Sequence, residues 1–107
     1  VLEKEMLSMS KNFIACDSIN VNGTHFQGVV KTTYDKIVKV LGEPTSYDAS
    51  PYEKVNASWS IEMKDEDKTV FTVYNWKDGY VPTEEYDWHI GGFDENAYLT
   101  ALDVLDK

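Results

Sequence analysis

The sequence predicts an α+β domain: an antiparallel β-sheet, made of a hairpin and a three-strand meander, with two helices packed on one face. Two segments repeat apolar residues at helical spacing, one segment alternates apolar and polar residues as half-buried strands do, and polar turns separate them. Helices on one face of an antiparallel sheet bury both kinds of apolar surface. The 107 residues fit a single domain, 1–107, in which the weakly patterned residues 1–10 are expected to form a short helix or a loose arm.

The N-terminal part of the chain predicts the hairpin. Residues 12–16 form a short apolar run that indicates a strand. Asn22 and Gly23 stand between extended segments, and both tolerate the positive φ of a type I′ turn. We therefore expect a hairpin at this pair, with its second strand running from about Thr24 to Val30.

Two segments predict helices. In the first, Thr32 or Thr33 is a suitable N-cap, Thr32 with Asp35 resembles a capping box, and Gly42 fits the left-handed C-cap. In the second, Asp94 is the expected N-cap. The apolar faces of the two helices consist of Tyr34, Ile37, Val38 and Leu41, and of Tyr98, Ala101, Leu102 and Leu105.

The meander is predicted from three segments between the helices. Residues 54–63 alternate strictly, which indicates one buried face. Residues 69–76 are apolar on both faces, so this strand is either central and covered twice or presents one face to a partner. Residues 86–90 are the third strand, which Gly91 and Gly92 are expected to end. The face of the first strand that should be buried holds Val55, Ala57, Trp59, Ile61 and Met63.

The charge balance limits the classes of partner. The chain has 19 Asp and Glu against 10 basic residues, all of them Lys, and a formal net charge of −9. A nucleic-acid-binding surface needs the opposite field, so we expect no direct nucleic-acid contact and favour basic protein surfaces instead. No run approaches the ~20 apolar residues that cross a bilayer. The single Cys16 cannot form an intramolecular disulfide, which favours a cytoplasmic location.

Few residues suggest catalysis. His89 with Asp87 could form a base and its orienting carboxylate, but a structural histidine at a sheet edge explains the pair better. Cys16 lacks a neighbouring base and is expected to be a buried thiol. The acidic residues 65–67 do not have calcium-loop spacing. We therefore expect no catalytic residue, no metal and no cofactor. A small enzyme or ligand-binding protein with a pocket near His89 stays as the alternative.

Aromatic residues are numerous in the meander and lie among acidic ones. The chain has three Trp and seven Tyr, and these residue types form the hot spots of protein interfaces. The alternative is that the rings only build the core. The predicted partner-binding set consists of Asp65, Glu66, Asp67, Tyr74, Trp76, Tyr80, Glu84, Glu85, Asp87 and Trp88.

Four segments together carry a resemblance to a known group. They are residues 34–44, ending in Leu41-Gly42-Glu43-Pro44; residues 54–61; residues 71–77, Phe-Thr-Val-Tyr-Asn-Trp-Lys; and residues 88–92, Trp-His-Ile-Gly-Gly. This pattern, spread over residues 28–92, resembles a group of small, largely uncharacterised bacteriophage-encoded proteins. The resemblance implies a phage origin, and no catalytic residues can be carried over from this group.

A phage origin leads to a functional expectation. Small acidic phage proteins without catalytic motifs often inhibit host machinery. We expect an accessory protein, not an enzyme, that acts in the host cytoplasm. It would inhibit a host protein, such as a nucleic-acid-acting defence system, as anti-restriction or anti-CRISPR proteins do. General protein binding is favoured over strict DNA mimicry because ten lysines dilute the negative charge. A homo-oligomeric structural module, paired through residues 69–76, is a further alternative.

Overall fold

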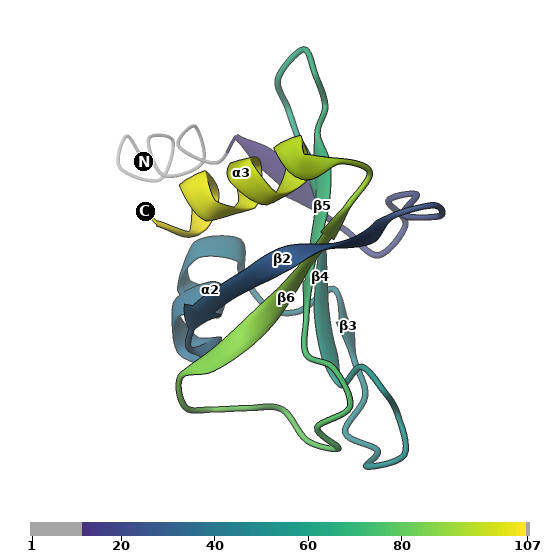
Figure 1. The fold of residues 1–107 in the computed structure, drawn as a ribbon, viewed down its shortest axis with the longest axis vertical. Coiled ribbons are helices and arrows are strands. Elements are labelled where there is room, and N and C mark those ends of the chain that lie inside the picture. Colours follow the sequence, from purple (N-terminus) through teal and green to yellow (C-terminus); the bar gives the residue numbers. More distant parts are fainter. Residues whose placement is uncertain (1–11, 107) are drawn as a thin grey trace, which may run out of the picture.

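A computed structural model describes residues 12–106 and has the predicted α+β fold, a six-stranded antiparallel sheet with two helices (Figure 1). The predicted arm, residues 1–10, lies outside the described residues. The strand order is β1-β4-β5-β6-β2, and β3 also pairs with β4. The strands are β1 (Phe13–Ala15), β2 (His25–Thr32), β3 (Ser46–Tyr47), β4 (Ala57–Met63), β5 (Val70–Tyr74) and β6 (Tyr86–Gly92), and the helices are α2 (Tyr34–Leu41) and α3 (Glu95–Leu105).

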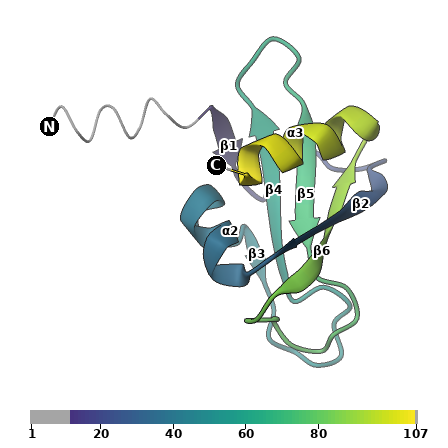
Figure 2. The ribbon, with the colours of Figure 1, turned by 60° about the vertical axis from the view of Figure 1, so that its left-hand side comes forward.

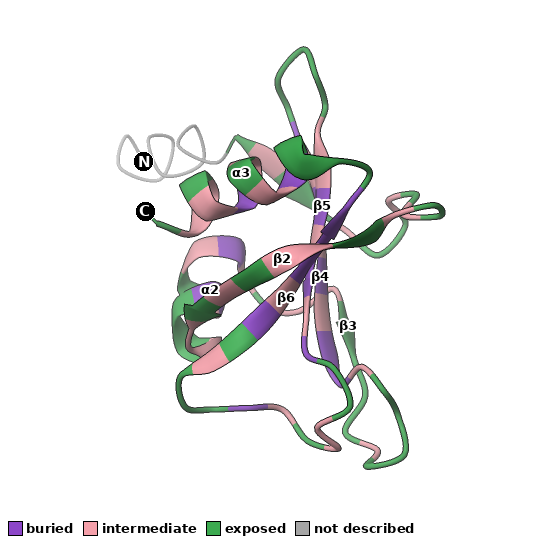
Figure 3. Ribbon diagram, viewed as in Figure 1, coloured by how far each residue is buried: buried purple, intermediate pink, exposed green. Residues whose placement is uncertain are grey.

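The core lies between the sheet and the two helices, which both pack on the same face (Figure 2). The alternation in β4 is confirmed, since Ala57, Trp59, Ile61 and Met63 are all buried. Burial of these and the other core side chains between the sheet and the helices stabilises the fold. Figure 3 shows how buried and less buried positions alternate along the central strands. The remaining core side chains are Ile37, Leu41, Phe71, Val73, Trp88, Ile90, Ala97 and Ala101.

The predicted N-terminal hairpin is wrong. Strand β1 pairs with the end of β4, not with β2. Asn22 and Gly23 do form a turn, in which the Thr24 N–H donates to the Val21 carbonyl at 3.1 Å. Only Gly23 of this pair has a positive φ, 90°, which is the pattern of a type II turn and not of the type I′ turn that joins paired strands.

The ends of two elements also differ from the prediction. Strand β6 does not stop at Ile90, as predicted, but continues through Gly91 and Gly92. The N-cap of α2 is Thr33, one of the two predicted candidates, and its hydroxyl accepts from the Lys36 N–H at 3.2 Å; the capping box predicted for Thr32 with Asp35 is wrong. Gly42 is the C-cap residue, as predicted, and has a positive φ of 90°, but its ψ of −169° lies outside the predicted left-handed helical conformation.

Candidate partner-binding surface

Within residues 12–106, neither helix covers the second face of the sheet, which we call the open face (Figure 1). Side chains alternate between the two faces along a strand, and directly paired residues share a face. The strand registers therefore define the open face. It holds Ile14, Phe26, Val29, Lys31, Ser58, Ser60, Glu62, Val70, Thr72, Tyr74, Asp87, His89 and Gly91.

Four rings cross the open face and form what we call the aromatic row: Phe26, His89, Tyr74 and Trp76. The ring centroids of Phe26 and His89 are 5.3 Å apart, those of His89 and Tyr74 are 5.4 Å apart and stacked, and those of Tyr74 and Trp76 are 6.3 Å apart. Phe26 is 56% exposed and Trp76 is 41% exposed. Exposed rings that gather on one face are typical of an interaction surface.

A bulge in β2 places Phe26 in the row. The pairing with β6 shifts between Phe26 and Gly28, so that Phe26 lies opposite Gly91 and Val29 opposite His89. An inserted residue changes the alternation, which lets two residues an odd number of positions apart share a face. Sequence reasoning missed both Phe26 and His89 as members of this surface, because their contact depends on the register between two distant strands.

The open face is hollowed beside the row. A cavity of about 290 Å³ is lined by residues that include Val21, Thr72, Tyr74, Trp76 and Gly91. Gly91 is one of the lining residues, and a Cβ at this position would come within 2.5 Å of the Thr72 hydroxyl oxygen. Because Gly91 has no side chain, this part of the open face stays hollow.

The predicted position of His89 at a sheet edge is wrong, because β6 lies between β5 and β2. Its Nδ1 is buried and makes no hydrogen bond with the described residues. Asp87 lies on the same face of β6, directly opposite Lys31 of β2. The ring of His89 contributes to the face through its contacts with Phe26 and Tyr74.

The structure divides the predicted acidic residues between the two ends of the sheet. Asp65, Glu66 and Asp67 are exposed in the turn between β4 and β5. Glu84 and Glu85 are exposed in the connection between β5 and β6, at the opposite end (Figure 1). Carboxylates therefore flank the open face at both ends without forming one cluster.

The assignment of Trp88 to the partner-binding set is wrong. Its side chain is fully buried, 0% exposed, in the core. The ring packs against Tyr86, Trp59 and Tyr34 at centroid distances of 5.3, 5.6 and 6.4 Å. Because β6 alternates, Trp88 faces the helices while its neighbour His89 faces the open side.

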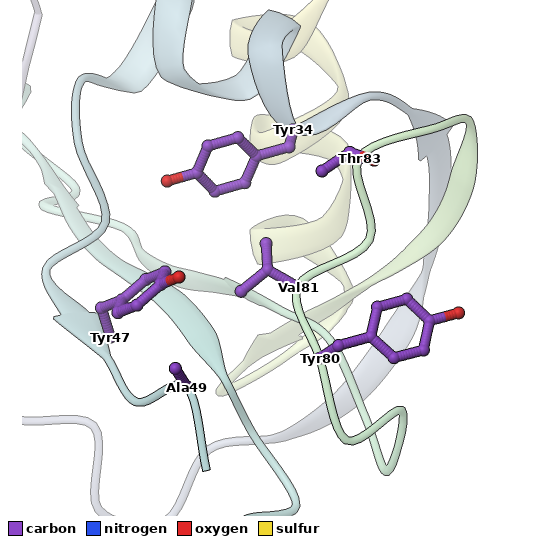
Figure 4. A pocket seen from close by; sticks show the side chains of 6 residues that line it. All are labelled: Tyr34, Tyr47, Ala49, Tyr80, Val81 and Thr83. Carbon is purple, nitrogen blue, oxygen red and sulfur yellow. The ribbon is translucent and has the colours of Figure 1, made fainter. Parts of the chain in front are cut away.

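A second cavity, of about 310 Å³, lies beside the N-terminus of α2, and we call it the tyrosine pocket (Figure 4). The rings of Tyr34 and Tyr47 lie on two sides of it with Val81 between them, whereas the ring of Tyr80 points away. Burial raises the pKa of the Tyr34 hydroxyl, and Glu43, Tyr47 and Asp35 raise it further. The residues that line the pocket are Tyr34, Tyr47, Ala49, Tyr80, Val81 and Thr83.

Two buried asparagines hold the loops beside both cavities. The Asn75 side-chain oxygen accepts from the backbone N–H groups of Asn56 and Ala57 at 2.8 and 3.0 Å. Its amide nitrogen donates to Asn56 Oδ1, to Asp78 Oδ2 and to the Tyr80 carbonyl.

The Asn56 amide nitrogen donates to the carbonyls of Asp48 and Ser50 at 2.7 and 2.9 Å. These bonds join residues 48–56 to residues 75–80, which bracket Trp76 and contribute Ala49 and Tyr80 to the pocket.

The Tyr86 hydroxyl is expected to ionise at a higher pH than an ordinary tyrosine. Its hydroxyl oxygen accepts from the Trp76 N–H at 3.2 Å. Burial, and then a hydrogen bond to Asp78, raise its pKa to about 12. The raised pKa means that the fold favours the neutral phenol, so this contribution to stability is complete below pH ~10 and is lost as the pH rises towards 12.

An absorbance titration at 295 nm tests this prediction. The Tyr86→Phe variant should lack an ionisation centred near pH 12 that the unsubstituted protein shows. The prediction is contradicted if the variant instead loses a step near pH 10, the ordinary value for tyrosine.

The single thiol and the acidic residues are the other candidate groups. Cys16 is half-buried, not buried as predicted; its sulfur lies 3.0 Å from the Ser18 hydroxyl, and this hydrogen bond lowers the thiol pKa. Residues 12–106 contain no group of three or more His, Cys, Asp or Glu arranged to hold a metal ion. In the same range, neither helix has the length and apolar character needed to span a bilayer.

No family model, curated protein or solved structure significantly matches this chain.

Proposed function

We propose that this protein binds a host protein through the open face of its sheet and inhibits it, without catalysing a reaction. The proposed target is a nucleic-acid-acting defence system in the bacterial cytoplasm, in line with the resemblance to phage proteins. The observation that carries the proposal is the aromatic row, in which exposed rings cross a face that neither helix covers.

Two physical properties of the surface support protein binding. Tyr, Trp and Phe bury large areas at little cost in conformational entropy, which is why they form interface hot spots. The net charge of −9, with carboxylates at both ends of the open face, attracts a basic partner and accelerates association. DNA mimicry in the strict sense would require a continuous row of closely spaced carboxylates. Here the acidic residues 65–67 and 84–85 lie at opposite ends of the sheet.

Capture of host proteins tests the proposal with a matched pair of variants. Phe26 on the open face and Leu99 on α3 are equally exposed, at 56% and 55%. We expect Phe26→Ser and Trp76→Ser each to reduce capture of the same host partner at least tenfold, a loss of about 1.4 kcal/mol. Leu99→Ser should leave capture unchanged. In a phage-infection assay, the two open-face variants should also lose protection of the phage from the defence system, and Leu99→Ser should keep it.

Salt separates the contributions of charge and rings. At about 0.5 M salt the Debye length falls to about 4 Å, so contacts made only by exposed carboxylates weaken strongly. A partner that stays bound at this salt, and is lost in Phe26→Ser, supports the aromatic row. If both open-face variants capture the partner normally, or if expression of the protein leaves host defence intact, the proposal is wrong.

Self-association through the same face is the second candidate function, because a second copy could bury the aromatic row equally well. Val70 and Tyr74 on the open face are only partly buried and Trp76 is 41% exposed, which favours it. Sedimentation equilibrium distinguishes the two: a dimer that Phe26→Ser dissociates assigns the face to self-association, and a monomer assigns it to another protein.

A further inference from the structure

We propose that the tyrosine pocket is a second recognition site and that it receives an arginine side chain of the protein partner. The inference rests on the proposed function only in assigning this side chain to a partner. The site itself is separate from the aromatic row, since the two cavities share no lining residue.

The walls of the pocket match the two halves of an arginine side chain. Ala49, Val81 and the methyl-bearing Thr83 provide an apolar lining for the methylene stem. The rings of Tyr34 and Tyr47 face the cavity from two sides (Figure 4). A planar guanidinium stacks on such rings and is attracted by their negative faces, which a compact ammonium exploits less well.

The charge around the pocket favours a cation. None of the six lining residues is charged, so an entering cation displaces no resident lysine. Glu43 and Asp35 lie close enough to Tyr34 to raise the pKa of its hydroxyl. This effect reports a negative potential at the phenol, and the same potential attracts a guanidinium. A neutral aliphatic side chain would fit the lining but would gain nothing from this field.

Small probes test the inference without the partner. We would titrate n-butylguanidinium and its uncharged analogue n-butylurea against the protein at constant ionic strength and follow the backbone amides by NMR. The guanidinium should shift the signals of Tyr47 and Val81, and the urea should bind at least threefold more weakly. Equal binding of the two probes would overturn the proposal and assign the pocket to a neutral side chain. Absence of shifts at these residues would also overturn it.

Variants locate the binding. Tyr47 is 60% exposed and can be replaced without opening the core. We expect Tyr47→Ala to weaken guanidinium binding at least fivefold and Glu43→Gln to weaken it about twofold to threefold. Tyr52→Ala, which removes a 94% exposed ring that does not line the pocket, should have no effect. If Tyr47→Ala binds the probe as the unsubstituted protein does, the pocket is not the site.

The outcomes for the two sites are independent. Failure of the probe to bind leaves the effect of Phe26→Ser on partner capture untouched. Conversely, a pocket that binds the probe in a protein that captures no partner would retain the guanidinium site and remove the proposed function.

Discussion

Replacing Asn75 with alanine is expected to lower the free energy of unfolding by about 4 kcal/mol. The side chain is fully buried and accepts from two backbone N–H groups, those of Asn56 and Ala57. Alanine leaves both donors without that acceptor, and each buried unsatisfied group costs about 1–3 kcal/mol. Urea denaturation followed by tryptophan fluorescence would measure the change.

The exposed Asn96 provides the control. Its side chain makes one hydrogen bond, to the Thr69 hydroxyl at 3.3 Å. Asn96→Ala should cost less than about 0.5 kcal/mol, as surface substitutions usually do. An Asn75→Ala variant that loses no more stability than Asn96→Ala would contradict the structural role of the network.

The same variant connects stability to the tyrosine pocket. Asn75 holds the Tyr80 carbonyl, and Asn56 holds the Asp48 and Ser50 carbonyls on either side of Ala49. Without the Asn75 side chain, residues 48–56 are held less firmly against residues 75–80, although the Lys77 N–H still donates to the Lys54 carbonyl. We therefore expect Asn75→Ala, at a temperature where it is still folded, to weaken guanidinium binding even though Asn75 does not line the pocket.

Local patterns predicted the helices and the meander because their signals lie within a few residues of one another. The caps of α2, the alternation of β4 and the two apolar faces of β5 all belong to this class. The pairings of β1 with β4 and of β2 with β6 join segments far apart in the chain. Nothing in a short window specifies such pairings, and the turn at Gly23 suggested a competing one.

The candidate surface was only partly predictable for the same reason. Tyr74 and Trp76 were predicted members, and the structure brings them together at 6.3 Å. Trp88 could have been excluded from the alternation of β6, which places it on the same face as Ile90. Phe26 could not have been included, because its position depends on a bulge. The asparagine network was equally hidden, since its partners come from two loops without a sequence pattern.

The second large effect is expected at the contact between the sheet and α3. A Cβ at Gly92 would overlap with the Cβ of Ala97, so the helix must move away if Gly92 becomes alanine. Overpacking of this kind usually costs about 1–3 kcal/mol, and we expect the upper end because both atoms belong to regular elements. Gly42→Ala is an informative contrast. It has open space around it, and its cost comes only from the φ of 90°.

A double-variant cycle tests whether the overlap is the cause. Ala97→Gly alone should cost about 1 kcal/mol, because glycine is a poor helix former. In the Gly92→Ala, Ala97→Gly pair the space is restored, so the double variant should be more stable than Gly92→Ala alone by about 1 kcal/mol. Simple addition of the two losses would contradict the proposed overlap.

Gly92 and Ala97 face the helical side of the sheet, so a folded Gly92→Ala protein should still capture the partner through Phe26 and Trp76. A loss of stability with binding retained would separate the side of the sheet that maintains the fold from the side that binds.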